Sequence, residues 1–451
     1  PSLKNFSPRN GFAWDPSGEG KFSVRGGFGL FHSQILSWCC TSAFFRSTPY
    51  AIRAEFDDDR PGDKEIINMF PRALDQLSST AGAVLEPPLF TMSQPKQPYL
   101  MQWSLTLQRE LMGDMAVTAT YSGSRGVKLP RVADVNRPVA TRGADGLWRY
   151  HCDSTGRGNT VCTQDADKRR ANTSYGSITN RVWDGTSDYH GLRLGLRKRF
   201  SAGHMFQISY NWQKGMDEGS SIAGSPRESF NDAWLSPNHL DRHSDRGLSS
   251  FNLVQAFSAN GALELPFGPG RRFGSGSDGI LAKVFGGWQL NGIVQMNSGP
   301  PLNIEGNPAR TCSVCNNILG NIKDGEQFPK NAEDPNGWFI SGDKMKTITD
   351  EEFPFTQPTP GRLGNLARNA GTGPGIINVD FSFLKDITLT EDTRIQFRAE
   401  FFNVFNRTNF QGPVRARATH SRGGTITRTF GELVQTATTA RQIQFAVKVL
   451  F

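Results

Sequence analysis

Apolar and polar residues alternate repeatedly along this 451-residue chain, and this pattern constrains the fold more than any other feature. Side chains two apart on a β-strand point the same way, so each alternating segment predicts a strand with one apolar and one polar face. The eleven predicted strands span residues 6–14, 22–30, 99–107, 115–121, 192–196, 206–212, 257–265, 288–296, 377–383, 395–401 and 443–451. We therefore expect an all-β, antiparallel fold built from five hairpins and one final strand.

The second face of these strands is strongly polar. In segment 395–401 the positions between the apolar residues hold Gln396, Arg398 and Glu400. An apolar face backed by a charged one is typical of an outer-membrane barrel, whose exterior contacts lipid and whose lumen is wet. The alternative is a large antiparallel sandwich in which each sheet has one solvated face.

The connections between strands favour the barrel, because short turns alternate with long segments. The long segments lie near 33–96, 124–188, 213–250, 297–375 and 407–440. Short periplasmic turns and long extracellular loops are typical of a transmembrane up-and-down β-barrel. Aromatic residues near the predicted strand ends fit interfacial girdles. They are Trp14, Trp103, Tyr121, Tyr210, Trp212 and Trp288.

Composition excludes two other classes. No run of eighteen apolar residues occurs, which excludes a helical membrane protein. Lys and Arg number 50 against 42 Asp and Glu, and this mild excess forms no basic stripe, so we expect no nucleic-acid partner.

The odd strand count is itself informative. A complete bacterial barrel has an even number of strands and both termini in the periplasm. Eleven strands therefore predict that residues 1–451 are the C-terminal part of a larger barrel, whose export signal, if any, has been removed or lies upstream of Pro1. The alternative is a missed strand around 425–430.

Several stretches together resemble TonB-dependent outer-membrane receptors, and among these the Oar-like group. They are NFSPRNGFAWD (5–15), VRGGFGLF (24–31), QWSLTLQRE (102–110), YSGSRGVKLP (121–130), FQISYNWQK (206–214), LELPFGPGRRF (263–273), GWQLNGIVQMNSGP (287–300), RAEFFNVFN (398–406) and RQIQFAVKVLF (441–451). The resemblance implies a 22-stranded barrel plugged by an N-terminal domain and energised by the TonB complex. The plug and its TonB box are expected to lie outside this chain.

The end of the chain resembles the signal read by the outer-membrane barrel assembly machinery, which pairs with the edge of the last strand. The residues concerned are Phe445, Val447, Val449 and Phe451. The alternative is that these residues only contact lipid.

Five arginines are predicted to face the lumen: Arg25, Arg193, Arg197, Arg394 and Arg398. They would either attract anions to the interior or form ion pairs with a plug.

All six cysteines fall in the predicted outer loops, which indicates disulfides in an oxidising compartment. Cys152 and Cys162 close a short loop and are the preferred pair. Cys312 and Cys315 form a C-x-x-C, predicted to be a local staple with metal or redox chemistry as the alternative. The adjacent Cys39 and Cys40 are expected to pair with other cysteines.

No pattern predicts catalysis, a cofactor or a metal. The acidic cluster at residues 55–59 lacks calcium-loop spacing, and His239 and His243 stand without an H-E-x-x-H. We therefore expect no enzyme. The predicted function is a TonB-dependent receptor, integral to an outer membrane of Gram-negative type, which takes up an unknown small ligand. A passive porin-like or adhesive barrel is one alternative, and a secreted soluble β-rich binding protein is another.

Overall fold

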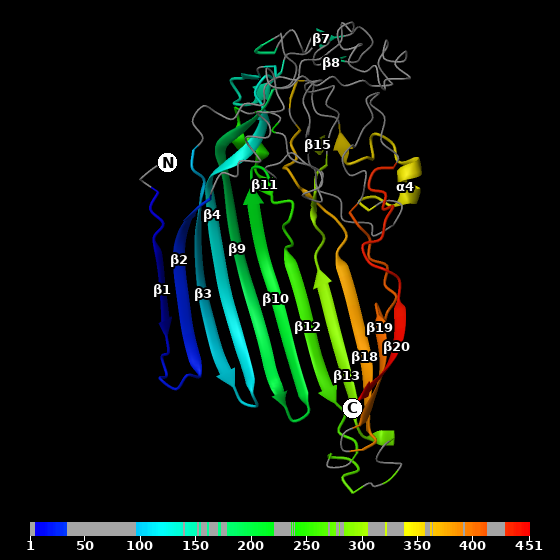
Figure 1. Cartoon of the computed structure of the whole chain (residues 1–451). Helices are drawn as coiled ribbons and strands as arrows, with labels where there is room; N and C mark the ends of the chain where they lie inside the picture. The colour runs from blue at the N-terminus through cyan, green and yellow to red at the C-terminus, as the bar shows by residue number, and fades with distance from the viewer. Residues whose placement is uncertain are drawn as a thin grey trace, which may run out of the picture.

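One large antiparallel sheet dominates the computed structural model (Figure 1). The structure describes residues 5–33, 96–138, 140–150, 153–154, 160–161, 170–172, 178–220, 236, 238, 240–268, 271–276, 279, 284–304, 321–322, 338–356, 361–362, 364–390, 393–412 and 429–451. Eleven strands pair in chain order: β1 (Arg9–Trp14), β2 (Phe22–His32), β3 (Tyr99–Leu111), β4 (Met115–Asp134), β9 (Thr179–Ser201), β10 (His204–Asp217), β12 (Gln255–Glu264), β13 (Trp288–Asn297), β18 (Ile376–Thr388), β19 (Arg394–Phe402) and β20 (Gln442–Leu450). A twelfth, short strand, β11 (Gly247–Leu248), pairs with β10.

The sequence-based fold prediction is confirmed, since every predicted strand coincides with one of the eleven. Tight turns close the hairpins at one end of the sheet, where Gly113 and Gly203 take positive φ values of 74° and 79°. The connections longer than 30 residues leave from the opposite end, while the connection between β12 and β13, residues 265–287, is the longest at the turn end (Figure 1). The proposed extra strand near 425–430 falls mostly outside the described residues.

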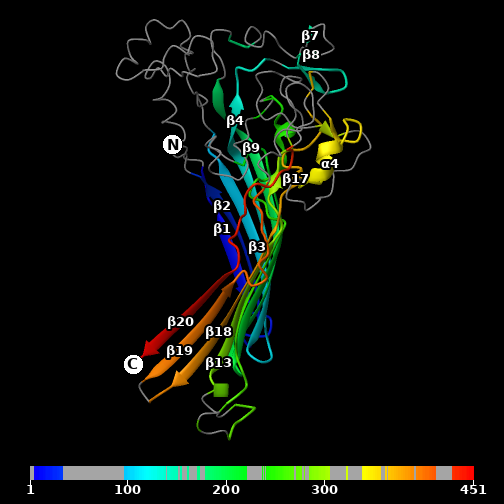
Figure 2. The same cartoon turned by 90° about the vertical axis from the view of Figure 1, so that its right-hand side faces the viewer.

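The sheet is curved and open. Figure 2 shows β18, β19 and β20 bending away from the neighbouring strands. Within the described residues, β1 pairs only with β2 and β20 only with β19. The described residues therefore form a trough-shaped section of barrel wall. No helix among them is long and apolar enough to cross a membrane.

Three strands extend further than the sequence predicts. β4 and β9 stay paired up to Asp134 and Thr179, and β10 reaches Asp217, so the predicted loop boundaries at 124–188 and 213 were wrong. These extensions lack apolar alternation because they project beyond the apolar band. The register of β4 and β9 also shifts at two bulges, which leave Lys128 and Asp184 unpaired. A bulge redirects side chains, so periodicity fails at these positions.

The outer region contains short elements as well as loops. The strand pairs are β5 (Thr141–Arg142) with β6 (Trp148–Arg149), β7 (Asp153–Ser154) with β8 (Thr160–Val161), β14 (Pro301–Leu302) with β17 (Gly371–Thr372), and β15 (Asn321–Ile322) with β16 (Phe355–Thr356). A 3-10 helix, η3, spans Arg242–Asp245. The helix α4 (Gly342–Thr347) is capped by Ser341, whose hydroxyl accepts from the Lys344 N–H.

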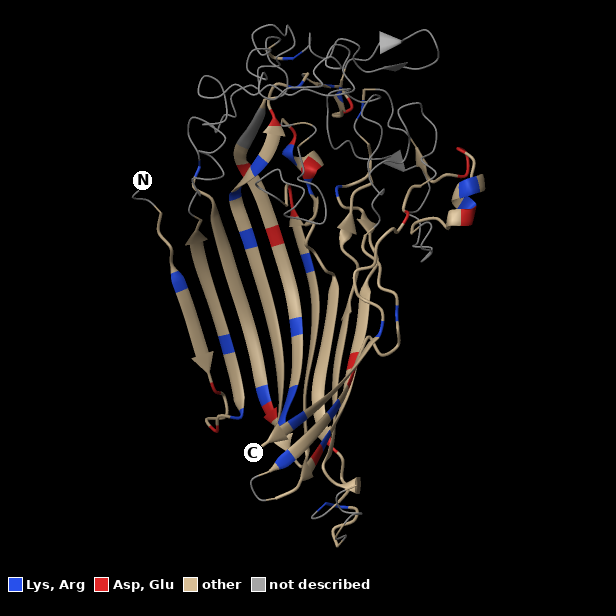
Figure 3. Cartoon of the chain, turned by 45° about the vertical axis from the view of Figure 1, so that its right-hand side comes forward, with Lys and Arg blue, Asp and Glu red and all other residues tan. Residues whose placement is uncertain are grey.

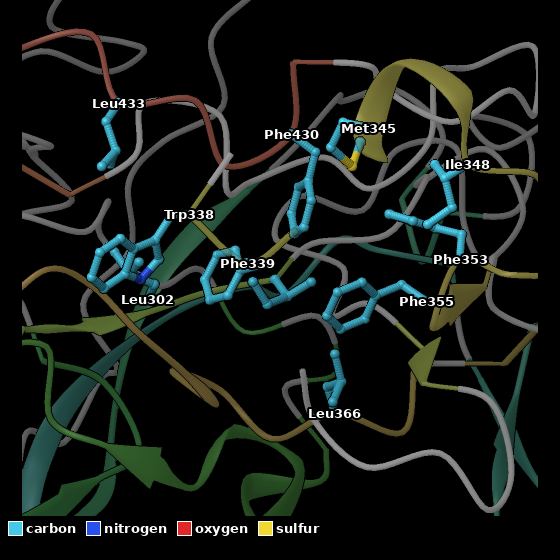
Figure 4. Packing of buried hydrophobic residues seen from close by; sticks show 11 residues of the cluster. Leu302, Trp338, Phe339, Met345, Ile348, Phe353, Phe355, Leu366, Phe430 and Leu433 are labelled. Carbon is cyan, nitrogen blue, oxygen red and sulfur yellow. The ribbon is translucent and has the colours of Figure 1, made fainter. Parts of the chain in front are cut away.

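The hydrophobic core lies in the outer loops rather than against the sheet (Figure 4). Phe430 stacks on Phe339 with ring centroids 5.4 Å apart and meets Phe353 and Phe355 edge-on. The indole of Trp338 donates to the Thr372 carbonyl at 2.7 Å. The described parts of the predicted loops 297–375 and 407–440 therefore pack together in this core, which the sequence analysis did not predict.

Candidate functional site: the two faces of the wall and its outer mouth

The apolar face of the sheet is exposed along the strands. Phe445 and Val447 are both 67% accessible, and Leu105, Leu194 and other alternating residues are exposed as well. A soluble protein rarely exposes an apolar surface that extends along many strands of a sheet. A sandwich would need a second large sheet to cover this face, and the described residues contain none. The face is therefore suited to contact with lipid.

An aromatic group marks this face toward the outer side. The Tyr121 hydroxyl and His190 Nδ1 are hydrogen-bonded at 2.8 Å, and Trp103 lies against His190 with ring centroids 6.2 Å apart. At the turn end, the Trp288 indole donates to the Val284 carbonyl at 2.9 Å. Aromatic rings with one polar atom suit the membrane interface.

On the opposite face, three of the predicted arginines line one polar groove of about 560 Å³. Arg25 bonds the Gln108 carboxamide, and Arg193 Nε donates to Ser209 Oγ at 3.3 Å, while Arg197 lines the same groove. No carboxylate of the described residues lies within 4 Å of these three guanidinium groups.

The groove has a marked charge excess. Five cationic side chains and two carboxylates line it, since Lys21 and Arg199 add to the three arginines while Glu110 and Asp114 oppose them. Lys21 also pairs with Glu19 at 2.8 Å. A concave surface lined mainly by one sign of charge concentrates counter-ions. The groove is therefore equipped to hold an anionic group.

The other two predicted arginines lie elsewhere. Arg394 and Arg398 are on β19, near the far edge of the sheet. Arg398 Nε donates to Gln396 Oε1 at 2.7 Å, and Gln396 donates on to Asp386 at 3.0 Å. They share a polar row but not the groove.

A buried ionic network occupies the outer ends of the strands, where Figure 3 shows charged residues close together. Arg131 is its centre: Nε and Nη2 donate to the two oxygens of Asp184 at 3.1 and 3.0 Å, and Nη1 donates to Asp245 at 2.5 Å. Arg131 and Asp245 are both fully buried. Asp184 reaches Arg131 because it stands at the β9 bulge.

A second part of the network joins distant loops to the wall. Arg368 bonds the Asp217 carboxylate, the Asp217 carbonyl and the Asp245 carbonyl. Glu218 accepts from the Thr186 N–H at 2.6 Å, and Arg246 lies 3.6 Å from Glu218. We call the outer ends of β4, β9 and β10, together with the loop residues bonded to them, the outer mouth. Charge-assisted hydrogen bonds between segments far apart in sequence hold the outer mouth together.

Ionisation in the network follows from this packing. Burial opposes the charge of Arg131, but the Asp184 hydrogen bond and the charges of Asp245 and Asp184 raise its pKa. Burial lowers the pKa of Arg137, against the charge of Asp134. Burial also raises the pKa of Tyr150 to about 12, so its phenol stays protonated at neutral pH.

Sequence reasoning missed both outer features. The charges of the network carry no periodicity, and its partners are up to 151 residues apart. The outer core had one local signal, the alternating pair Phe353 and Phe355 within a predicted loop.

Several predicted sites lie outside the described residues. These are Cys39, Cys40, Cys152, Cys162, Cys312, Cys315, the acidic cluster at 55–59 and His239. The preferred Cys152–Cys162 disulfide thus stays a prediction. Across the part of the chain that is described, no group of three or more His, Cys, Asp or Glu side chains is placed to hold a metal ion.

A profile of the family described as "Outer membrane beta barrel domain" matches residues 1–444 of this chain. The chain belongs to that family. This barrel domain is accordingly an integral part of the outer membrane, with the short turns on the periplasmic side and the long loops outside. No match is found among curated protein sequences.

Solved structures resemble the barrel domain at low identity. The outer membrane transporter YddB from Escherichia coli aligns with a TM-score of 0.43 and 10% identity, over 98% of this chain and 40% of YddB. FpvA of P. aeruginosa, solved with heterologous pyoverdines, aligns with a TM-score of 0.40 and 9% identity, over 98% of this chain and 32% of FpvA. The FrpB iron transporter from Neisseria meningitidis aligns with a TM-score of 0.37 and 10% identity, over 98% of this chain and 39% of FrpB. The barrel domain spans less than half the length of each.

The final strand gives a direct prediction for membrane assembly. Deleting Phe451, the 99% exposed last residue, is expected to leave most of the protein outside the outer membrane if the β20 edge is the assembly signal. Lys448→Ala, on the same strand but opposite face, is the control. The measurement is the heat-modifiable fraction in outer-membrane preparations. Equal fractions for both variants would mean that Phe451 only contacts lipid.

Proposed function

We propose that this barrel domain is the C-terminal part of a TonB-dependent outer-membrane receptor of the Oar-like kind, which captures a small ligand at its outer loops. The observation that carries the proposal is the pairing of an ordered outer mouth with a basic groove on the lumen wall below it. A merely structural wall needs neither a network of buried ions nor a groove with an excess of positive charge. The sequence resemblance adds the energy-coupled class to this picture.

In the proposed mechanism the packed outer loops bind the ligand, and a plug in the lumen then rearranges to release it inward. The partners are the TonB complex, reached through a plug, and the barrel assembly machinery at β20. No catalytic step, cofactor or metal is needed for this cycle.

Energy coupling is tested on the full-length product of the gene. Its coding sequence upstream of Pro1 is expected to encode a signal peptide, a plug, about eleven more strands and a TonB box. The purified protein is expected to bind the periplasmic domain of TonB. A coding sequence without a plug, together with no TonB binding, would contradict the proposal and favour a passive or adhesive barrel.

The lumen arginines are proposed to attract anionic groups, whether on the ligand or on the plug. Replacing Arg25, Arg193 and Arg197 with Gln removes the charge excess of the groove. In planar bilayers, with the plug of the full-length protein unfolded by urea, the reversal potential in a KCl gradient is expected to shift toward cation preference. Lys344→Gln with Lys346→Gln, on exposed α4, is the control. An unchanged reversal potential in the triple variant would contradict the proposal.

A further inference from the structure

The membrane-facing side of the sheet carries one apolar hollow of about 600 Å³, over β10, β12, β13 and β18. Its floor is a cross-strand pair of glycines, Gly261 and Gly292, and its walls are Phe206 and Phe381 in the same register row. Leu263 and Leu290 line the side nearer the periplasmic turns. Polar side chains contribute almost nothing to this surface.

Elsewhere on this face the protein covers its own glycines. The Phe12 ring fills the space where a Cβ of Gly26 would lie, and the Trp103 ring does the same at Gly123. Aromatic cover of this kind compensates for the missing side chain of a glycine in a strand.

The hollow is left uncovered by comparison. The nearest atom to a Cβ on Gly292 is a ring carbon of Phe381, and it is 4.0 Å away. A Cβ on Gly261 would instead meet the Met205 carbonyl oxygen at 3.0 Å and the Phe206 Cβ at 3.2 Å. A glycine inside a strand weakens it and often marks a place where another group approaches closely. Gly292 therefore leaves room for a group from outside the chain.

We propose that the hollow is a binding site for one phospholipid, which seats an acyl chain over Gly261 and Gly292. The hollow is continuous with the membrane-facing surface, so hydrocarbon is the medium that reaches it. A cavity of about 150 Å³ lined by similar side chains accepts benzene, so about 600 Å³ has room for a length of acyl chain.

The position of the hollow selects phospholipid over the lipid A of the outer leaflet. Phe206 is the third residue of β10 after the periplasmic turn. Trp288 and Lys385 pair four register positions from the Gly292–Phe381 pair, toward the periplasmic end. Trp and Lys at that level are typical of the membrane interface. The hollow thus lies in the periplasmic half of the span.

The test compares lipids retained by the full-length protein extracted from outer membranes, by native mass spectrometry. Gly292→Leu fills the hollow and is expected to lose one bound phospholipid relative to wild type. Ala119→Leu adds three carbons, against four in Gly292→Leu, to the membrane-facing side of β4 away from the hollow, and is expected to keep the bound phospholipid. Gly292→Ala, whose Cβ meets nothing closer than 4.0 Å, is expected to fold normally and show reduced occupancy.

Three results would overturn the proposal. One is equal phospholipid retention by wild type, Gly292→Ala and Gly292→Leu. Another is a bound mass that corresponds to lipid A. The third is a dimer of the protein that dissociates on Gly292→Leu, which would make the hollow an interface between two copies. Heat-modifiable mobility checks that each variant is folded.

Discussion

Asp245→Ala is expected to destabilise the outer mouth by about 3–5 kcal/mol, the usual cost of removing one partner from a buried ion pair. Asp245 is fully buried, and its loss removes one of the carboxylates that Arg131, also buried, bonds. The segment around η3 is therefore expected to detach from β4 and β9. Hydrogen exchange of the amides in 241–250 measures the effect.

The control for Asp245→Ala is Asp343→Ala, which removes an ion pair with Lys346 on exposed α4, where Asp343 is 96% accessible. Exposed ion pairs contribute little, so exchange in 241–250 and across the outer mouth should stay as in wild type. If Asp245→Ala behaved like this control, the buried network would not be what holds the outer mouth.

Phe430→Ala is expected to cost about 3–5 kcal/mol of stability in the outer-loop core, as large-to-small changes of buried aromatics do. Phe430 has no exposed surface and contacts three other phenylalanines. It comes from one long loop and the three rings come from another, so its loss should separate the two. The measurement is the rate of limited proteolysis between residues 338 and 372 on intact cells.

Val434→Ala is the matched control for Phe430→Ala, because Val434 lies in the same segment but is 62% exposed. Its proteolysis rate should equal that of wild type. If Phe430→Ala were cleaved as slowly as wild type, the two loops would be ordered independently of each other.

The strands were predictable because each is encoded locally. Alternation along β19 or β20 is imposed by lipid on one side and water on the other, so ten residues suffice to reveal it. At the outer end of β4 the consecutive residues Arg131, Val132, Ala133 and Asp134 are all buried, so no alternation is imposed and the prediction ended too early. The bulges at Lys128 and Asp184 removed the remaining periodicity.

The candidate site was predictable only in part. Alternation placed Arg25, Arg193 and Arg394 on one face, but the face alone does not give the position around the wall. Cross-strand register sets that position, and it brings Arg25 and Arg193 into one groove while Arg394 lies near the far edge. The Arg131–Asp245 pair joins residues 114 apart, and no local pattern records such a contact.

The central claim is that the two faces of this sheet meet different media, and spin-label accessibility along β19 tests it most directly. Single cysteines at positions 394–401 of the full-length protein would carry a nitroxide in bilayers. The background has all native cysteines replaced by serine, including the six in residues 1–451. Labels at Ile395, Phe397 and Phe401 are expected to collide mainly with oxygen, which concentrates in lipid. Labels at Gln396 and Glu400 are expected to collide with a water-soluble nickel chelate. A period of two in opposite phase for the two reagents would support a membrane wall with a wet lumen, whereas low accessibility of the apolar positions to both reagents would contradict it.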